Sequence, residues 1–355
     1  MSWAADAIFG AVEPVRWPGD APIRLHLVVD TEESFDWSGP FRREGHDLRA
    51  LRVLPLLIRR LERWRLVPTC VVTWPVVASA DGRAILGELL ASRTIAVGAH
   101  LHPWVTPPFE EPLGSATSYA GNLAPGLEAA KLAALGDRIG EAFGRPPRVY
   151  KAGRYGLGPA TAGILERLGY RIDLSGYPRR DLRGDGGPDY RNMPDRPFRF
   201  GPGRRLLELP MSCGHVGRLA GVPGAARLLD RPRLARLRLG GALARSGLLE
   251  RVTLTPEGFT LAEQARLARA LVARGHRLLC LSLHSPSLAP GNTPYAPDAA
   301  ACSALLDRLE GVLDLVLGEL GGVPTTAEAV LDVLEARPAS RADDAAARDR
   351  TGSAG

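Results

Sequence analysis

Two kinds of apolar pattern alternate along most of the chain. Short runs rich in β-branched and aliphatic residues, such as IRLHLVVD at 23–30, predict strands. Segments with apolar residues three and four positions apart, such as 49–66, predict helices, and Pro55 is expected to delay or kink the start of that helix. Further strands are predicted at 67–77, 94–97, 147–153, 171–175, 205–210, 251–255 and 277–283. Further helices are predicted at 83–93, 126–144, 159–170, 231–249, 260–276 and 298–320. Because strands that alternate with crossover helices form parallel sheets, this pattern predicts an α/β fold.

The alternating pattern occupies residues 23–335 and leaves a segment on either side. Residues 1–22 form a lead-in rich in Pro and Gly, and residues 336–355 are polar and low in complexity, which predicts a disordered tail. With 355 residues and 45% hydrophobic content, the chain is long enough for a single α/β barrel. The loop at 184–203 is long enough to act as a lid over a cleft.

Composition narrows the classes of function. The net charge is +6, but only Lys131 and Lys151 are lysines, so the excess of Arg indicates genomic bias, and no nucleic-acid-binding motif accompanies it. The four Cys form no CxxC pair, which argues against disulfides and against a Cys-based zinc site. Neither a membrane-spanning apolar segment nor a signal-peptide pattern is present, so we expect a cytoplasmic protein.

The basic, Leu-rich segment 231–249 allows two interpretations. A solvated helix face is the plainer one. The other is contact with an anionic substrate carrier or with the inner membrane surface through charge attraction.

Ionisable side chains follow the predicted strands. Functional groups in parallel α/β folds gather at the carboxyl ends of strands, so these positions are candidates for chemistry. They are Asp30, Glu32, Glu33, Asp36, His100, His102, Arg154, Asp173 and His284.

His100 and His102 are separated by one residue, as are Asp30 and Glu32. On extended backbone such pairs point to the same side. Two His and one carboxylate are a recurrent ligand set for zinc and related divalent ions, and an open position on the ion holds a nucleophilic water. Packing histidines, helix-capping acids and ordinary Arg ion pairs are the competing explanations.

Five segments, VVDTEESFDW, GAHLHPW, KAGRYG, DLSGYP and LSLHSPS, occur in an order that resembles the motifs of the polysaccharide deacetylases, the NodB-homology carbohydrate esterases. The likeness is greatest to the WalW-like branch and spans about residues 23–335. It implies a distorted (β/α)7-type barrel and a metal-dependent hydrolase that removes N-acetyl groups from a sugar or a surface-polysaccharide precursor.

The resemblance also implies roles for individual residues. Asp30 matches the general base, held by Arg154, and His284 matches the general acid, oriented by Asp173. His100 and His102 match the metal ligands. In the implied mechanism, metal-bound water attacks the amide, and a backbone N–H near Tyr155 helps the metal to stabilise the oxyanion. Trp37, Trp104 and Tyr155 are expected to stack on the sugar.

Two departures from the family pattern leave alternatives open. The first motif reads Asp-Thr-Glu, so Glu32 is the preferred third ligand, with Asp30, Glu33 and Asp36 as alternatives. The two histidines lie two positions apart rather than four. We expect a divalent metal, with Zn2+ preferred. The rival functions are a metal-dependent hydrolase of another, cyclic, amide and an inactive carbohydrate-binding barrel.

Overall fold

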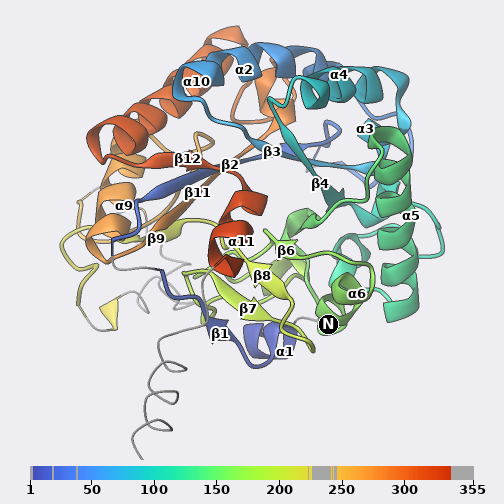
Figure 1. Ribbon diagram of the computed structural model, residues 1–355, viewed down its shortest axis with the longest axis horizontal. Helices are drawn as coiled ribbons and strands as arrows, with labels where there is room; N and C mark the ends of the chain where they lie inside the picture. The colour runs from blue at the N-terminus through green and yellow to red at the C-terminus, as the bar shows by residue number, and fades with distance from the viewer. Residues whose placement is uncertain are drawn as a thin grey trace, which may run out of the picture.

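The alternating pattern folds into one curled sheet with helices along its outside (Figure 1). The computed structural model describes residues 3–17, 20–36, 39–222, 224–225, 241, 243 and 246–336. Across the sheet the parallel strands are β8 (Leu206–Glu208), β6 (Ile172–Asp173), β5 (Val149–Ala152), β4 (Ala96–Leu101), β3 (Thr69–Val72), β2 (Arg24–Thr31) and β11 (Leu278–His284). Three shorter strands extend it: β7 (Phe198–Phe200) and β1 (Glu13–Pro14) add antiparallel edges beyond β8, and β12 (Val323–Thr325) pairs with the start of β2.

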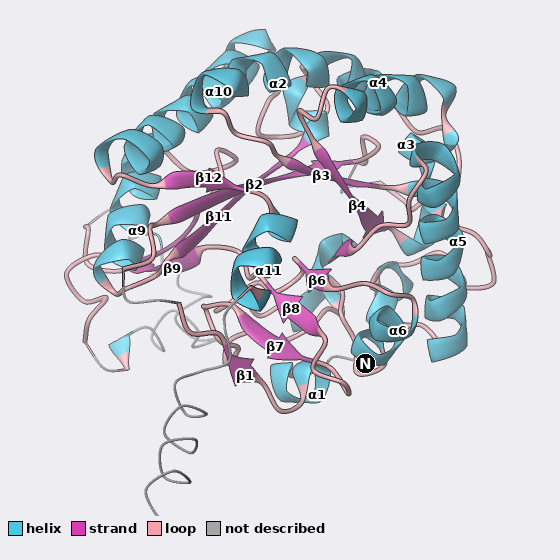
Figure 2. Ribbon diagram, in the orientation of Figure 1, coloured by secondary structure: helices cyan, strands magenta, loops and turns pink. Residues whose placement is uncertain are grey.

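Helices form an arc around the outside of these strands (Figure 2). They are α2 (Leu54–Leu61), α3 (Trp74–Ala78), α4 (Ala80–Ala91), α5 (Pro125–Phe143), α6 (Thr161–Arg167), α9 (Leu261–Ala273) and α10 (Ala299–Leu313). Local sequence sets several of their ends. Pro55 lies in the first turn of α2, where its missing N–H costs nothing, and Thr260 with Glu263 forms a capping box at the start of α9. The predicted helix 231–249 falls almost wholly outside the described residues, as do Trp37 and the tail beyond residue 336.

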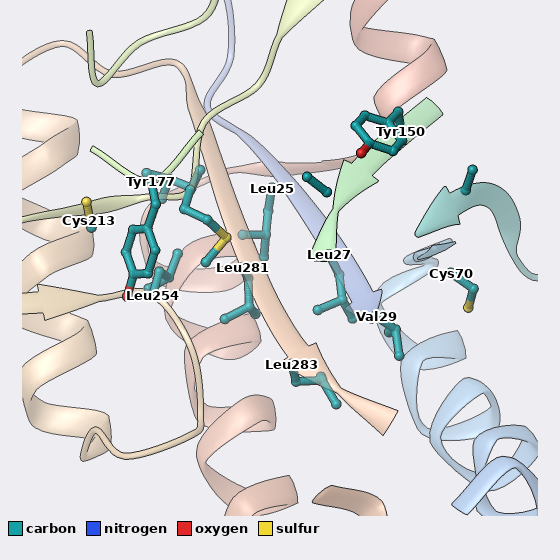
Figure 3. Packing of buried hydrophobic residues seen from close by; sticks show 14 of the residues in the cluster. Leu25, Leu27, Val29, Cys70, Tyr150, Tyr177, Cys213, Leu254, Leu281 and Leu283 are labelled. Atoms are coloured by element: carbon teal, nitrogen blue, oxygen red, sulfur yellow. The ribbon is translucent and has the colours of Figure 1, made fainter. Parts of the chain in front are cut away.

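Alternate residues of each strand face two different cores. On β2, Leu25, Leu27 and Val29 belong to a cluster, shown in part in Figure 3, that also contains residues of the surrounding helices. This side of the sheet is called the outer face. Val28 on β2 and Val149 on β5 belong to a second cluster, filled by the last helix, α11 (Ala327–Glu335), and its side is called the inner face. Whether a side chain at the end of a strand faces the inner or the outer core therefore depends on its position in this alternation.

Several elements differ from the sequence prediction. The expected strand 67–77 stops at Val72, and α3 begins two residues later, with Pro75 in its first turn. β4 runs to Leu101, four residues beyond the predicted end, so His100 lies within the strand. The strand expected at 251–255 is β10 (Glu250–Thr253), which pairs antiparallel with β9 (Cys213–Val216) apart from the main sheet.

The two segments expected to be loops are also more ordered than predicted. The lead-in contains helix α1 (Ala5–Phe9), which buries Ile8 and Phe9, and strand β1. The segment 184–203 contributes β7 to the sheet and buries Tyr190 and Phe198, so it is not a continuous loop. Its role as a lid stays a prediction. Within the described residues, no helix has the length and apolar character needed to cross a bilayer.

Candidate active site

A pocket of about 490 Å³ opens at the carboxyl ends of the parallel strands. Asp30 of β2, His100 of β4, Lys151 of β5 and His284 of β11 all line it. Asp30, Lys151 and His284 each follow an inner-face residue by two or four positions along their strands, so they share its side of the sheet. His100 lies between Ala99 and Leu101, which belong to the outer core, so its side chain faces the inner side as well. The curl of the sheet then brings side chains from separate strands into one cavity.

Glu32, His100 and His102 form a buried cluster that is able to hold a metal ion. His100 Nε2 and His102 Nε2 each lie 3.2 Å from the same atom, Glu32 Oε2. All three side chains are at most 7% exposed, so their polar atoms face one another and not bulk solvent.

The other ring nitrogens of both histidines are already engaged. His100 Nδ1 donates to the carbonyl oxygen of Lys151 at 2.9 Å, and His102 Nδ1 donates to Glu33 Oε1 at 2.7 Å. The hydroxyl of Thr73 donates to the second oxygen of Glu33 at 2.8 Å. These bonds fix both rings and leave each Nε2 available to ligate, an arrangement typical of metal-binding histidines. The residues present therefore fit a divalent ion with nitrogen and oxygen ligands.

The charges of this cluster support the same conclusion. Burial acts to raise the pKa of Glu32, but its bonds to His100 and His102 lower it well below its usual value. Burial acts to lower the pKa of His102, yet Glu33 and Glu32 raise it to about 10. Concentrated negative charge around the histidines thus favours a cation, whether proton or metal.

Asp30 lies beside the cluster and is held by Lys151. Lys151 Nζ donates to both carboxylate oxygens, at 2.7 and 2.6 Å, and both side chains are almost fully buried. Although burial acts to raise it, the pKa of Asp30 is lowered by Lys151, with further contributions from His100 and His284. Asp30 is therefore an ionised acceptor at neutral pH.

His284 faces Asp30 across the pocket. Its Nε2 lies 3.5 Å from Asp30 Oδ2, and its Nδ1 donates to Glu257 Oε2 at 2.7 Å. Glu257 in turn accepts hydrogen bonds from the backbone N–H of His284 and from the hydroxyl of Ser287. Burial acts to lower the pKa of His284, but Glu257 raises it to about 10, so the ring is protonated and aimed into the pocket.

Two residues that the family resemblance places beside Asp30 and His284 lie elsewhere in the structure. Arg154, expected to hold Asp30, instead lies against Ser118 and Asp185 on the rim. Lys151 holds Asp30, because its parity on β5 is that of the inner face and Arg154 lies beyond the strand in a short 3-10 turn.

Asp173, expected to orient His284, points away from the pocket. It is in register with Tyr150, which belongs to the outer core, whereas its neighbour Ile172 belongs to the inner core. Asp173 Oδ1 accepts from the backbone N–H and the hydroxyl of Ser175, and Glu208 lies in register with it on the neighbouring strand. In the structure Glu257, and not Asp173, is hydrogen-bonded to His284 Nδ1.

Of the aromatic residues expected to stack on the sugar, Trp104 and Tyr155 lie in different surroundings. Trp104 is 2% exposed and stacks on His102, with 4.3 Å between ring centroids, so it supports the ligand and offers no face to a sugar. Tyr155 lines the pocket, beside Tyr177. Arg154 and Tyr155 both have positive φ, 54° and 60°, a costly conformation for non-glycine residues that is concentrated at functional sites.

Sequence reasoning missed Lys151 and Glu257, though each carried a signal. Lys151 is one of two lysines in the chain and lies inside a buried, apolar strand, where an unpaired ammonium is costly. Glu257 follows the strand predicted at 251–255, so the rule that searched the other strand ends would have found it there.

Comparisons with known proteins agree with this fold. No family model and no curated protein matches the sequence. Among solved structures, one from Mycobacterium smegmatis described as a polysaccharide deacetylase superposes with a TM-score of 0.51, at 16% identity over 92% of this chain and 94% of that one. A structure described as Puue allantoinase gives 0.50, at 14% identity over 93% and 96%.

These likenesses concern the fold. They confirm the prediction of an α/β fold with a distorted (β/α)7-type barrel of the NodB-homology kind. Substrate and reaction have to be argued from the residues of this chain.

Proposed function

We propose that this protein is a metal-dependent deacetylase that hydrolyses the N-acetyl group of a sugar or a surface-polysaccharide precursor. The observation that carries the proposal is the convergence of His100 Nε2 and His102 Nε2 on Glu32 Oε2, beside a base and an acid of opposite charge. This set supports hydrolysis of an amide better than binding alone, because a carbohydrate-binding pocket needs neither a metal cluster nor a proton donor.

Glu32, His100 and His102 would hold the ion, for which Zn2+ suits the nitrogen and carboxylate ligands. When bound there, such an ion polarises a carbonyl oxygen and lowers the pKa of water. No ligand role is assigned to Asp30, since both of its oxygens already bond Lys151, or to Glu33, since it accepts from His102 and Thr73. Glu33 instead fixes the ring of His102, and Asp30 is held beside the cluster by Lys151.

Asp30 acts as the general base in this proposal. Its ionised carboxylate accepts a proton from the attacking water, and Lys151 keeps it charged and in place. His284 acts as the general acid on the opposite side: it gives its Nε2 proton to the departing amine, and Glu257 holds the ring in the required orientation. Tyr155 offers its ring to the sugar, and acetate and a free amine are the products.

Metal content and turnover test the proposal together. The purified protein is expected to retain about one divalent ion per chain and to release acetate from N-acetylated sugars. His100→Ala and His102→Ala are expected to lose both, while His215→Gln, on the separate β9–β10 ribbon, keeps both. Full activity in the protein stripped of metal would refute the proposal. A protein that binds sugar but releases no acetate would be the inactive barrel.

A second candidate is hydrolysis of a cyclic amide, which is favoured by the superposition on an allantoinase. The same metal ligands, base and acid serve either bond. A parallel screen of cyclic ureides and N-acetyl sugars, with the faster substrate class deciding, separates the two. Membership in the WalW-like branch is likewise a proposal. So is membrane contact through residues 231–249, which lie almost wholly outside the described part of the chain.

A further inference from the structure

The charges that line the pocket pair off, with one exception among the described residues. Asp30 bonds Lys151, Glu257 bonds His284, and Asp185 bonds Arg154. Arg180 lines the same pocket, but it contacts no carboxylate in the part of the chain that the structure describes. Its Nε is buried and has no hydrogen-bond partner among the residues that the structure describes. A buried donor of a permanently charged group without a partner is costly, so this site is suited to receive an acceptor from outside.

The backbone fixes Arg180 in this position. Its N–H donates to Tyr177 at 3.3 Å, and its carbonyl oxygen accepts from Tyr190 at 2.8 Å. The preceding residue, Arg179, has a φ of 64° and directs its guanidinium to Asp195, at 2.7 Å. Strained backbone at Arg179 thus separates two consecutive arginines, one in a structural ion pair and the other in the pocket.

Aromatic rings connect Arg180 to the reactive groups. Its guanidinium lies over the ring of Tyr177, 4.8 Å from the centroid, and that ring contacts Tyr155 at 4.6 Å. Lys151 Nζ lies 5.3 Å from the centroid of Tyr155 and bonds Asp30. The hydroxyl of Tyr177 bonds Thr253 at 2.8 Å, which holds this floor rigid. A ligand that lies in the pocket along this row of side chains would reach Arg180 at one end and Asp30 at the other.

We propose that Arg180 binds an anionic group of the substrate, so that the enzyme prefers acetylated sugars that carry a carboxylate or a phosphate. The inference rests on the proposed deacetylase function and names its substrate class. A guanidinium stacked on an aromatic ring presents its remaining N–H groups in a fixed fork, which matches the paired oxygens of either anion. Stacking has already restricted the side chain, so little further entropy is lost when the anion binds.

The test compares three substrates that share the scissile amide: N-acetylglucosamine, its 6-phosphate, and N-acetylmuramic acid, which adds a carboxylate. Wild-type protein is expected to favour at least one anionic sugar over the neutral one by about ten- to a hundredfold in kcat/KM, chiefly through KM. The phosphate and the carboxylate sugars are separate arms, and the better one identifies the anion.

The variant Arg180→Gln is expected to lose that preference and to change turnover of the neutral sugar by no more than about threefold. Arg180→Lys, which keeps the charge but not the fork, should keep part of it. Arg138→Gln, on the outer helix α5, removes the same charge away from the pocket and is expected to keep the full preference. Equal losses for neutral and anionic sugars in Arg180→Gln would overturn the proposal and leave deacetylation intact.

Calorimetric binding of the same three sugars separates this proposal from the deacetylase assignment. If no sugar is hydrolysed, the deacetylase assignment fails, and binding still tests Arg180. Weaker binding of the anionic sugars in Arg180→Gln, with the neutral sugar unchanged, would support an anion subsite. Identical binding of all three sugars by wild type and variant would refute it.

Discussion

Two pairs of acidic residues lie at the carboxyl edge of the same sheet and have opposite electrostatic character. Asp30 and Glu32, at the end of β2, face cations, and their pKa values are lowered. Asp173 on β6 and Glu208 on β8 are in register with each other on the outer face. Burial raises the pKa of Asp173 to about 6 and that of Glu208 further above its usual range.

The difference comes from the face of the sheet and not from burial, because all four side chains are at most 6% exposed. On the inner face, Lys151 and the histidines compensate the charge. On the outer face, the oxygens Asp173 Oδ2 and Glu208 Oε2 have no donor among the described residues, so the two carboxyl groups must share a proton. Parity along a strand therefore decides whether an acid at this edge serves chemistry or packing.

Removing one of the proposed metal ligands on the inner face should have the largest effect on metal binding and activity. Glu32→Gln takes away the carboxylate that both histidines face, and we expect metal affinity to fall by more than about 100-fold, with activity lost in parallel. Metal content after dialysis against a weak chelator measures this. Glu208→Gln is the matched control on the outer face, and a comparable loss of metal in that variant would refute the distinction between the faces.

Breaking the inner ion pair should have the next largest effect. Lys151→Met takes away the cation that bonds both oxygens of the buried Asp30 carboxylate, which leaves His284 at 3.5 Å as its nearest charged neighbour among the described residues. We expect unfolding free energy at pH 7 to fall by about 3–5 kcal/mol. Urea denaturation measures it. The double variant Asp30→Asn with Lys151→Met removes both charges and should recover most of the loss. If the double variant is as unstable as the single one, charge is not the cause.

A smaller effect is expected on catalysis from Glu257. Its carboxylate keeps His284 protonated, so Glu257→Gln should lower the pKa of the acid and reduce kcat by about 10- to 100-fold. The basic limb of the pH–rate profile should then move to lower pH. A fall in kcat with an unchanged profile would mean that Glu257 has only a structural role.

We expect the smallest effect from a change in the outer-face pair, Asp173 and Glu208, and we expect it to be a gain in stability. The folded pKa of Asp173, about 6, exceeds its unfolded value, 3.8, so its contribution to stability is present at low pH and is lost as pH rises from about 4 through 6. Asp173→Asn keeps the acceptor for Ser175 and adds a donor toward Glu208. We expect it to stabilise the protein at pH 7 by about 1–3 kcal/mol and to flatten this part of the stability profile. Lower stability at pH 7 in the variant would contradict the shared proton.

The sequence predicted the alternation, the fold class and the inner-face cluster, because period and motif spacing are local properties. His100 and His102, like Asp30 and Glu32, were predicted to point the same way, and in the structure they do. The ends of strands were less predictable. β6 is only two residues long, and although RIDLS at 171–175 alternates, the alternation alone does not say which of its two sides is the inner face. β3 ends where Thr73 bonds Glu33, a contact made across 40 residues of chain.

Contacts between side chains that are far apart in the sequence were the hardest to predict. Arg154 lies next to Tyr155 in a chain rich in Arg, and nothing local distinguishes a residue that holds the base from one that pairs with Asp185 on a rim. Glu257 reaches His284 from the segment after β10, outside the main sheet, so the order of motifs gave no reason to connect them. The face of the strand on which a side chain lies and the curl of the sheet, and not the residue type, decide which residues come into contact.

The last helix, α11, fills the inner core of the barrel and so limits the routes by which reactants enter and products leave. Ala327, Val330 and Leu331 of α11 occupy the inner core below the catalytic groups and stop the barrel from the amino ends of its strands. Within the described part of the chain, this leaves the pocket mouth as the route for traffic in both directions. In the proposed reaction, acetate released at the bottom of the pocket would have to pass the bound sugar or wait for it to leave, which would order the departure of products and make acetate a measurable inhibitor.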